Sequence, residues 1–117
     1  MLMLLSLVTV EVVAARNSNT VKFIELEKWD QGVRSAAPNP IECYLMDDYI
    51  EVRFIEYPEL PFTLQIKDAY GNVVYQKLEM NSKQNAFIIK TDHLQPGSYE
   101  LYYSAGEMIL KGEVKIE

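Results

Sequence analysis

The fold of this chain is decided by Leu94-Gln95-Pro96-Gly97-Ser98-Tyr99, a stretch followed by the alternating Glu100-Leu101-Tyr102-Tyr103. The order Leu-x-Pro-Gly-x-Tyr immediately before a strand is typical of a tyrosine corner. There, a Pro-Gly turn delivers a tyrosine whose ring packs under the turn and whose hydroxyl bonds to backbone a few residues upstream. The motif belongs to antiparallel β-sandwiches, so it predicts an architecture and leaves the chemistry open. We expect structural roles for Leu94, Pro96, Gly97 and Tyr99.

Alternation of apolar and polar residues recurs outside this stretch. Apolar residues or glycine occupy every second position in residues 50–54, 62–66 and 108–116. A period of two over this length indicates strands with one face on a core and one face in water. Turn signals such as Asp47-Asp48 and Tyr70-Gly71-Asn72 separate the strands. Roughly seven strands and no sustained helical period predict an all-β, immunoglobulin/fibronectin-III-like antiparallel β-sandwich.

The part of the chain before residue 41 has a different character. Residues 21–26 are interpreted as a first strand, whereas residues 27–40 are expected to be irregular because two closely spaced prolines disfavour regular structure. We therefore predict an N-terminal strand and proline-rich linker over residues 16–40. The main body of a single sandwich domain is predicted over residues 41–117, which suits a chain of 117 residues.

The first ten residues are almost wholly apolar but too short to span a bilayer. Their length suits the core of a signal peptide, and Val13-Ala14-Ala15 offers the small residues that a signal peptidase recognises. No basic residue precedes the apolar run, and Glu11 lies late in it, so a plain first strand is the alternative. We predict a signal peptide over residues 1–15 and export to the periplasm, the cell surface or the medium.

The net charge of the chain limits the classes of partner that it can bind. The formal net charge is −6, and lysine and arginine form no cluster along the sequence. Nucleic acid and anionic membrane surfaces would both repel such a chain. We therefore expect neither as a partner, and we expect no transmembrane segment.

Few residues could carry catalysis or bind a metal. Cys43 is the only cysteine, and its apolar neighbours favour a buried, inert thiol; His93 is the only histidine. A triad through Asp92 and His93 lacks a nucleophile-elbow sequence, and one histidine with one cysteine cannot supply the usual zinc ligands. Asp47 and Asp48 could offer oxygens to calcium together with Asp92, although adjacent acids more often form turns. We predict no catalytic residue, no cofactor and no metal site.

Aromatic residues are more numerous than the inner faces of so small a domain require. The chain has eight tyrosines and one tryptophan. Exposed tyrosine and tryptophan side chains are the usual anchors for a protein surface or a sugar ring, although ordinary coverage of amphipathic strands is the simpler explanation. The residues expected to be available for such a contact are Trp29, Tyr49, Tyr57, Tyr70 and Tyr102.

Trp29, Gly32, Arg34 and Ser35 resemble a Trp-x-x-Gly-x-Arg-Ser element near the mature N-terminus of a family of small secreted proteins. These are proteins of unknown function from Gram-negative gut commensals of the Bacteroides type. Residues 62–75, the Pro-Gly-Ser-Tyr turn and the last strand follow the same order, so the resemblance covers nearly the whole mature chain. It implies an immunoglobulin-like β-sandwich and brings no activity with it.

A second resemblance is to the C-terminal sorting domains of the type IX secretion pathway. Those domains follow a large cargo, which this sequence does not contain, so we interpret the likeness as a shared fold. The matching residues are Asn39-Pro40, Asp68 with Gly71, and Leu94 with Gly97 and Tyr99. The resulting hypothesis is a secreted, non-enzymatic domain that binds a protein or a glycan. A sorting or envelope-tethering module is the alternative.

Overall fold

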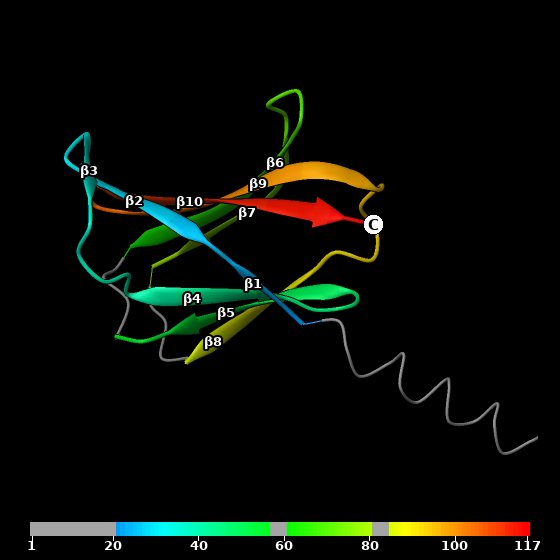
Figure 1. Cartoon of the computed structure of the whole chain (residues 1–117), viewed down its shortest axis with the longest axis horizontal. Helices are drawn as coiled ribbons and strands as arrows, with labels where there is room; N and C mark the ends of the chain where they lie inside the picture. Colours follow the sequence, from blue (N-terminus) through cyan, green and yellow to red (C-terminus); the bar gives the residue numbers. More distant parts are fainter. Residues whose placement is uncertain (1–20, 57–60, 81–84) are drawn as a thin grey trace, which may run out of the picture.

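Two antiparallel sheets pack face to face in the computed structural model (Figure 1). The structure describes residues 21–56, 61–80 and 85–117, so the predicted signal peptide and Tyr57 lie outside the described residues. None of the described residues belongs to a helix that is long and apolar enough to cross a membrane. The strands are β1 (Lys22–Ile24), β2 (Leu26–Asp30), β3 (Val33–Ser35), β4 (Ile41–Leu45), β5 (Tyr49–Phe54), β6 (Phe62–Asp68), β7 (Val73–Glu79), β8 (Ala86–Lys90), β9 (Gly97–Ala105) and β10 (Met108–Ile116).

Sheet A has four strands in the order β1-β4-β5-β8, and sheet B has six strands in the order β3-β2-β10-β9-β6-β7. The strands β4 to β10 form the main body of the sandwich, because β5 pairs with β4 and β8 while β9 pairs with β6 and β10. The all-β, immunoglobulin-like prediction is thus confirmed. The sequence predicted roughly seven strands, a first one over residues 21–26 among them, whereas the described residues form ten.

The prediction of an irregular segment over residues 27–40 is wrong for its first part, which contains most of β2 and all of β3. These strands form a hairpin whose turn residues Gln31 and Gly32 both have positive φ angles, 55° and 81°. Positive φ at both central positions suits the right-handed twist of a two-residue hairpin, but glutamine is an unusual residue there. The turn was therefore not recognisable from its sequence. Residues 36–40 form no strand, as expected of a linker.

The predicted first strand over residues 21–26 is divided between the two sheets. Its first half, β1, pairs with β4 in sheet A, and at Glu25 the chain crosses to sheet B, where β2 pairs with β10 (Figure 1). The crossing passes directly over Gly112. A Cβ atom at Gly112 would lie 2.8 Å from the Glu25 carbonyl oxygen and 2.8 Å from the side chains of Ile24 and Leu26. Only glycine allows the two backbones to approach this closely.

The core lies between the sheets and matches the alternation of the sequence. Most inward residues of β5, β6, β9 and β10 are buried, and four aromatic rings meet at one end of this core with neighbouring centroids 5.2–6.4 Å apart. These rings belong to Phe54, Phe62, Phe87 and Tyr103. Aromatic clusters of this kind contribute beyond the area they bury.

The tyrosine corner is present where the sequence placed it. The Tyr99 ring is buried, and its hydroxyl donates a hydrogen bond of 2.6 Å to the carbonyl oxygen of Gln95. Leu94 packs against the core, and Pro96 and Gly97 lead into β9. The corner therefore fixes the path of the chain from sheet A into the central strand of sheet B.

Candidate functional site

The outer face of sheet B carries a row of side chains that crosses five strands. Trp29 on β2 is paired with Ile109 on β10, Ile109 with Ser104 on β9, Ser104 with Thr63 on β6, and Thr63 with Leu78 on β7. We call these five residues the transverse row. Trp29, Ile109 and Leu78 are 36%, 40% and 59% exposed. Large apolar groups thus stand in water at both ends of the row, with two small hydroxyl side chains between them.

Tyr102 lies on the same face of sheet B, two residues before Ser104 in β9. Its hydroxyl donates a hydrogen bond of 2.9 Å to a carboxylate oxygen of Glu100, and the Lys67 ammonium lies 4.5 Å from the centre of its ring. Partial burial is the main cause that raises the pKa of Tyr102, and the hydrogen bond to Glu100 is the second. One face of the ring is already occupied by Lys67. Tyr102 is therefore a fixed part of the surface rather than a free stacking platform.

Two depressions hollow the polar part of this face. One of about 820 Å³ is bordered by the β6–β7 loop, and one of about 590 Å³ is bordered by Glu27 and Arg34. Glu100 and Glu113 line both of them, so the depressions adjoin each other. Their walls carry both signs of charge, with ion pairs of 3.6 Å between Arg34 and Glu27 and 3.7 Å between Lys111 and Glu100.

Tyr70 borders the larger depression from the tip of the β6–β7 loop, which projects from sheet B away from sheet A (Figure 1). Its side chain is 90% exposed. The loop is organised by Asp68, whose carboxylate accepts hydrogen bonds of 2.9 Å from the backbone N–H groups of Tyr70 and Asn72. These hydrogen bonds lower the pKa of Asp68, and the bond from the Asn72 backbone has the largest effect. The loop therefore presents Tyr70 on an ordered support.

Tyr49 is on the other side of the molecule. It begins β5, is paired with Lys90 and is only half-buried, on the outer face of sheet A. On that face Tyr44 is held by its own neighbours, with Phe23 packed edge-on at 5.5 Å and the Arg53 guanidinium 4.5 Å from the ring centre. The structure therefore brings Trp29, Tyr70 and Tyr102 to one surface and places Tyr49 on another.

The sequence did not single out Ile109, Leu78, Ser104 or Thr63 as site residues. The alternation within a strand predicts that each of them points outward. It does not predict which outward residues of different strands lie side by side. That they form a row with Trp29 depends on which strands are neighbours and in which register. Nothing local in the sequence carries that information.

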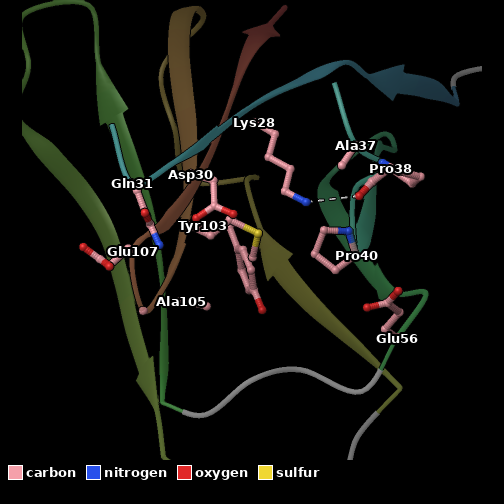
Figure 2. A pocket seen from close by; sticks show the side chains of 12 residues that line it. Lys28, Asp30, Gln31, Ala37, Pro38, Pro40, Glu56, Tyr103, Ala105 and Glu107 are labelled. Atoms are coloured by element: carbon pink, nitrogen blue, oxygen red, sulfur yellow. Dashed lines mark hydrogen bonds between the residues drawn. The ribbon is translucent and has the colours of Figure 1, made fainter. Parts of the chain in front are cut away.

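A third depression, of about 610 Å³, opens between the sheets beside the β2–β3 and β9–β10 turns (Figure 2). Lys28 reaches across it and donates a hydrogen bond of 3.3 Å to the carbonyl oxygen of Pro38. The carboxylates of Asp30, Glu56 and Glu107 also line it. Lys28 thus ties the linker to β2, which gives this depression a structural role.

The residues considered for chemistry are dispersed. Cys43 is buried, and burial raises its pKa to about 12. Asp92 and His93 are exposed, 3.7 Å apart. The backbone N–H of Thr91 donates to the carbonyl oxygen of Asp48, so the two loops of the calcium alternative do meet. Even so, no three acidic, histidine or cysteine side chains of the described residues are placed to hold a metal ion.

Comparison with known proteins agrees with this architecture. The sequence model of a family described as a domain of unknown function, DUF3244, matches residues 23–116. The chain belongs to the DUF3244 family. A crystal structure at 1.70 Å of a DUF3244 protein with an immunoglobulin-like β-sandwich fold, from Bacteroides vulgatus ATCC 8482, is similar with a TM-score of 0.70. The alignment has 21% identity and covers 84% of this chain and all of that one.

No curated protein matches the chain. The resemblance to an immunoglobulin-like family of unknown function is confirmed by the DUF3244 match and by the Bacteroides structure. Neither assigns a ligand or an activity.

Proposed function

We propose that this DUF3244 protein is an exported, non-enzymatic binding domain that holds a protein partner on the outer face of sheet B. The observation that carries the proposal is the pair of exposed apolar side chains Trp29 and Ile109, which are direct cross-strand neighbours. Tryptophan is among the residues most enriched where binding energy concentrates. An exposed isoleucine beside it enlarges the apolar contact.

The composition of the surface favours a protein over a glycan. A sugar ring stacks on an aromatic face and forms hydrogen bonds with polar groups. Exposed aliphatic side chains such as Ile109 and Leu78 contribute little to such binding. Protein interfaces combine an apolar centre with a charged and polar rim. Here the transverse row supplies the apolar groups, and residues such as Arg34, Lys111 and Glu113 supply the rim.

Export belongs to the same proposal and rests on the apolar run before Val13-Ala14-Ala15. The mass of the mature protein, isolated from the native organism, tests it. We expect an N-terminus at Arg16. An intact Met1 on the mature protein would contradict export through a cleaved signal.

The partner is sought by photo-cross-linking in intact native cells. A photo-reactive residue at Ile109 should capture one defined protein, and Trp29→Ala in the same chain should reduce the yield roughly tenfold or more, as expected for loss of an interface tryptophan. A photo-reactive residue at Ile88, exposed on the outer face of sheet A, is the matched control. Equal capture from both positions would contradict the assignment of the surface.

The two alternatives, a glycan ligand and a sorting module, are distinguished by two further experiments. Binding of the purified protein to a glycan array, abolished by Trp29→Ala, would replace the protein partner with a glycan. A reporter fused to the whole mature chain separates binding from sorting. Transfer of that reporter to the cell surface, without a partner cross-linked at Ile109, would favour the sorting module.

A further inference from the structure

The four sheet edges formed by the described residues are not alike. The edge strands β1 and β3 have three residues each and β8 has five, whereas β7 has seven. Exposed edge strands tend to be kept short or charged, because their free N–H and C=O groups can pair with another chain. Only β7 is long among the edge strands of the described residues. It contains no proline, exposes apolar side chains and carries one charge of each sign, Lys77 and Glu79.

The apolar side chains of β7 are exposed to water. Val73, Val74 and Leu78 are exposed, and Met80 follows directly after the strand. The pairing of β7 with β6 is regular from Glu79 to Tyr75 and shifts register only near the loop, between Ile66 and Lys67. The half of β7 around Leu78 is thus a regular strand whose second edge pairs with no strand of the described residues.

The sequence of this half matches an antiparallel copy of itself. Lys77 and Glu79 flank Leu78 symmetrically, so an identical strand running antiparallel and centred on Leu78 places each Lys77 opposite a Glu79 of the other copy. Opposite charges directly across an antiparallel pair stabilise it, and like charges weaken it. The same register places Leu78 against Leu78. A register centred on Lys77 would instead set the two ammonium groups against each other.

We propose that the β7 edge pairs with the β7 edge of a second copy of this chain, antiparallel and centred on Leu78. The two copies of sheet B then join into one continuous sheet. The proposal goes beyond the proposed function, because it concerns an edge of the sheet and a different occupant. Capture of a partner through Trp29 and Ile109 can fail while the β7 pairing holds, and the reverse is equally possible.

Charge reversal tests the pairing with its own control. Sedimentation of the full mature chain should show a concentration-dependent dimer. Lys77→Glu and Glu79→Lys should each weaken it roughly tenfold or more, because both cross-strand pairs become repulsive. An equimolar mixture of the two variants should recover a dimer of one copy of each. This recovery shows that both variants are folded, and a mixture that stays monomeric overturns the proposal.

Cysteine cross-linking tests the register. Leu78→Cys should form an intermolecular disulfide under mild oxidation, because residue 78 faces itself across the pair. Thr63→Cys, on the neighbouring strand β6, is the matched control and should remain reduced. The native Cys43 is buried and will not interfere. A wild-type protein that is monomeric at all concentrations, or equal cross-linking at both positions, would overturn the proposal.

Discussion

The hydroxyl of Tyr99 lies 2.6 Å from the carbonyl oxygen of Gln95 and donates a hydrogen bond to it across the turn that precedes β9. The bond links two residues that are four positions apart, at the point where the chain passes from sheet A to sheet B. It spans a turn whose residues Pro96 and Gly97 have no side-chain group that could form a hydrogen bond. The path of the turn therefore depends on this tyrosine.

Tyr99→Phe removes this bond and leaves the ring. We expect the free energy of unfolding to fall by about 1–2 kcal/mol, because the Gln95 carbonyl loses its partner in a partly buried place. Urea denaturation measures the loss. Tyr70→Phe, at a residue that is 90% exposed, is the control and should leave stability unchanged. Equal stability of both variants would contradict a structural role for the corner.

Gly112→Ala introduces a methyl group where the chain crosses between the sheets. Its Cβ would lie 2.8 Å from the backbone oxygen of Glu25, which cannot move without shifting β1 or β2. We expect a loss of about 1–3 kcal/mol in the free energy of unfolding, the usual effect of overpacking. Glu113→Ala, next along the strand and exposed, serves as the control. A Gly112→Ala protein as stable as wild type would show that the crossing can relax.

Asp68→Asn tests the support of the Tyr70 loop through its pH dependence. The pKa of Asp68 is lower in the folded protein than in the unfolded chain, so its ionised form stabilises the fold at neutral pH. That contribution is present above the unfolded pKa of about 4 and is lost as the pH falls through the lower folded value. Wild type should thus be more stable than the variant at pH 7, and the difference should shrink in acid. A difference independent of pH would exclude the carboxylate as its cause.

Cys43 should not react while the protein is folded. With a pKa raised to about 12 from 9.0, its thiolate fraction at pH 8 is roughly a thousandfold smaller than that of a free thiol. A thiol-specific reagent should modify it only upon unfolding, so the rate should rise with urea. Rapid modification under native conditions, at a rate independent of unfolding, would contradict this prediction.

Much of the fold could be predicted because its signals are local. The strands β4, β5, β6, β9 and β10 each have one buried face, and this produces a period of two that can be followed along the sequence. The β2–β3 hairpin was missed for a physical reason. The inward positions of β2 include Lys28 and Asp30, which face the open depression rather than the core, so the alternation there is not apolar.

The site was less accessible to sequence reasoning. Trp29, Tyr70 and Tyr102 were chosen as aromatic residues at outward or loop positions, and all three lie on or beside the outer face of sheet B. Their relation to Ile109 arises from the pairing of β2 with β10, strands that are far apart along the chain. Long-range pairing of this kind depends on the whole packed core. Residues in one strand do not encode their neighbours in another.

Trp29 is the only tryptophan of the chain, and it stands on the proposed binding surface instead of in the core. The intrinsic fluorescence of the protein is therefore an optical reporter of that surface. A ligand that covers the transverse row should shift the emission to shorter wavelength without any attached dye. Unfolding should shift it the other way, to longer wavelength, because an indole that is 36% exposed in the fold becomes fully hydrated. A single titration in a cuvette can thus distinguish occupancy of the surface from loss of the fold.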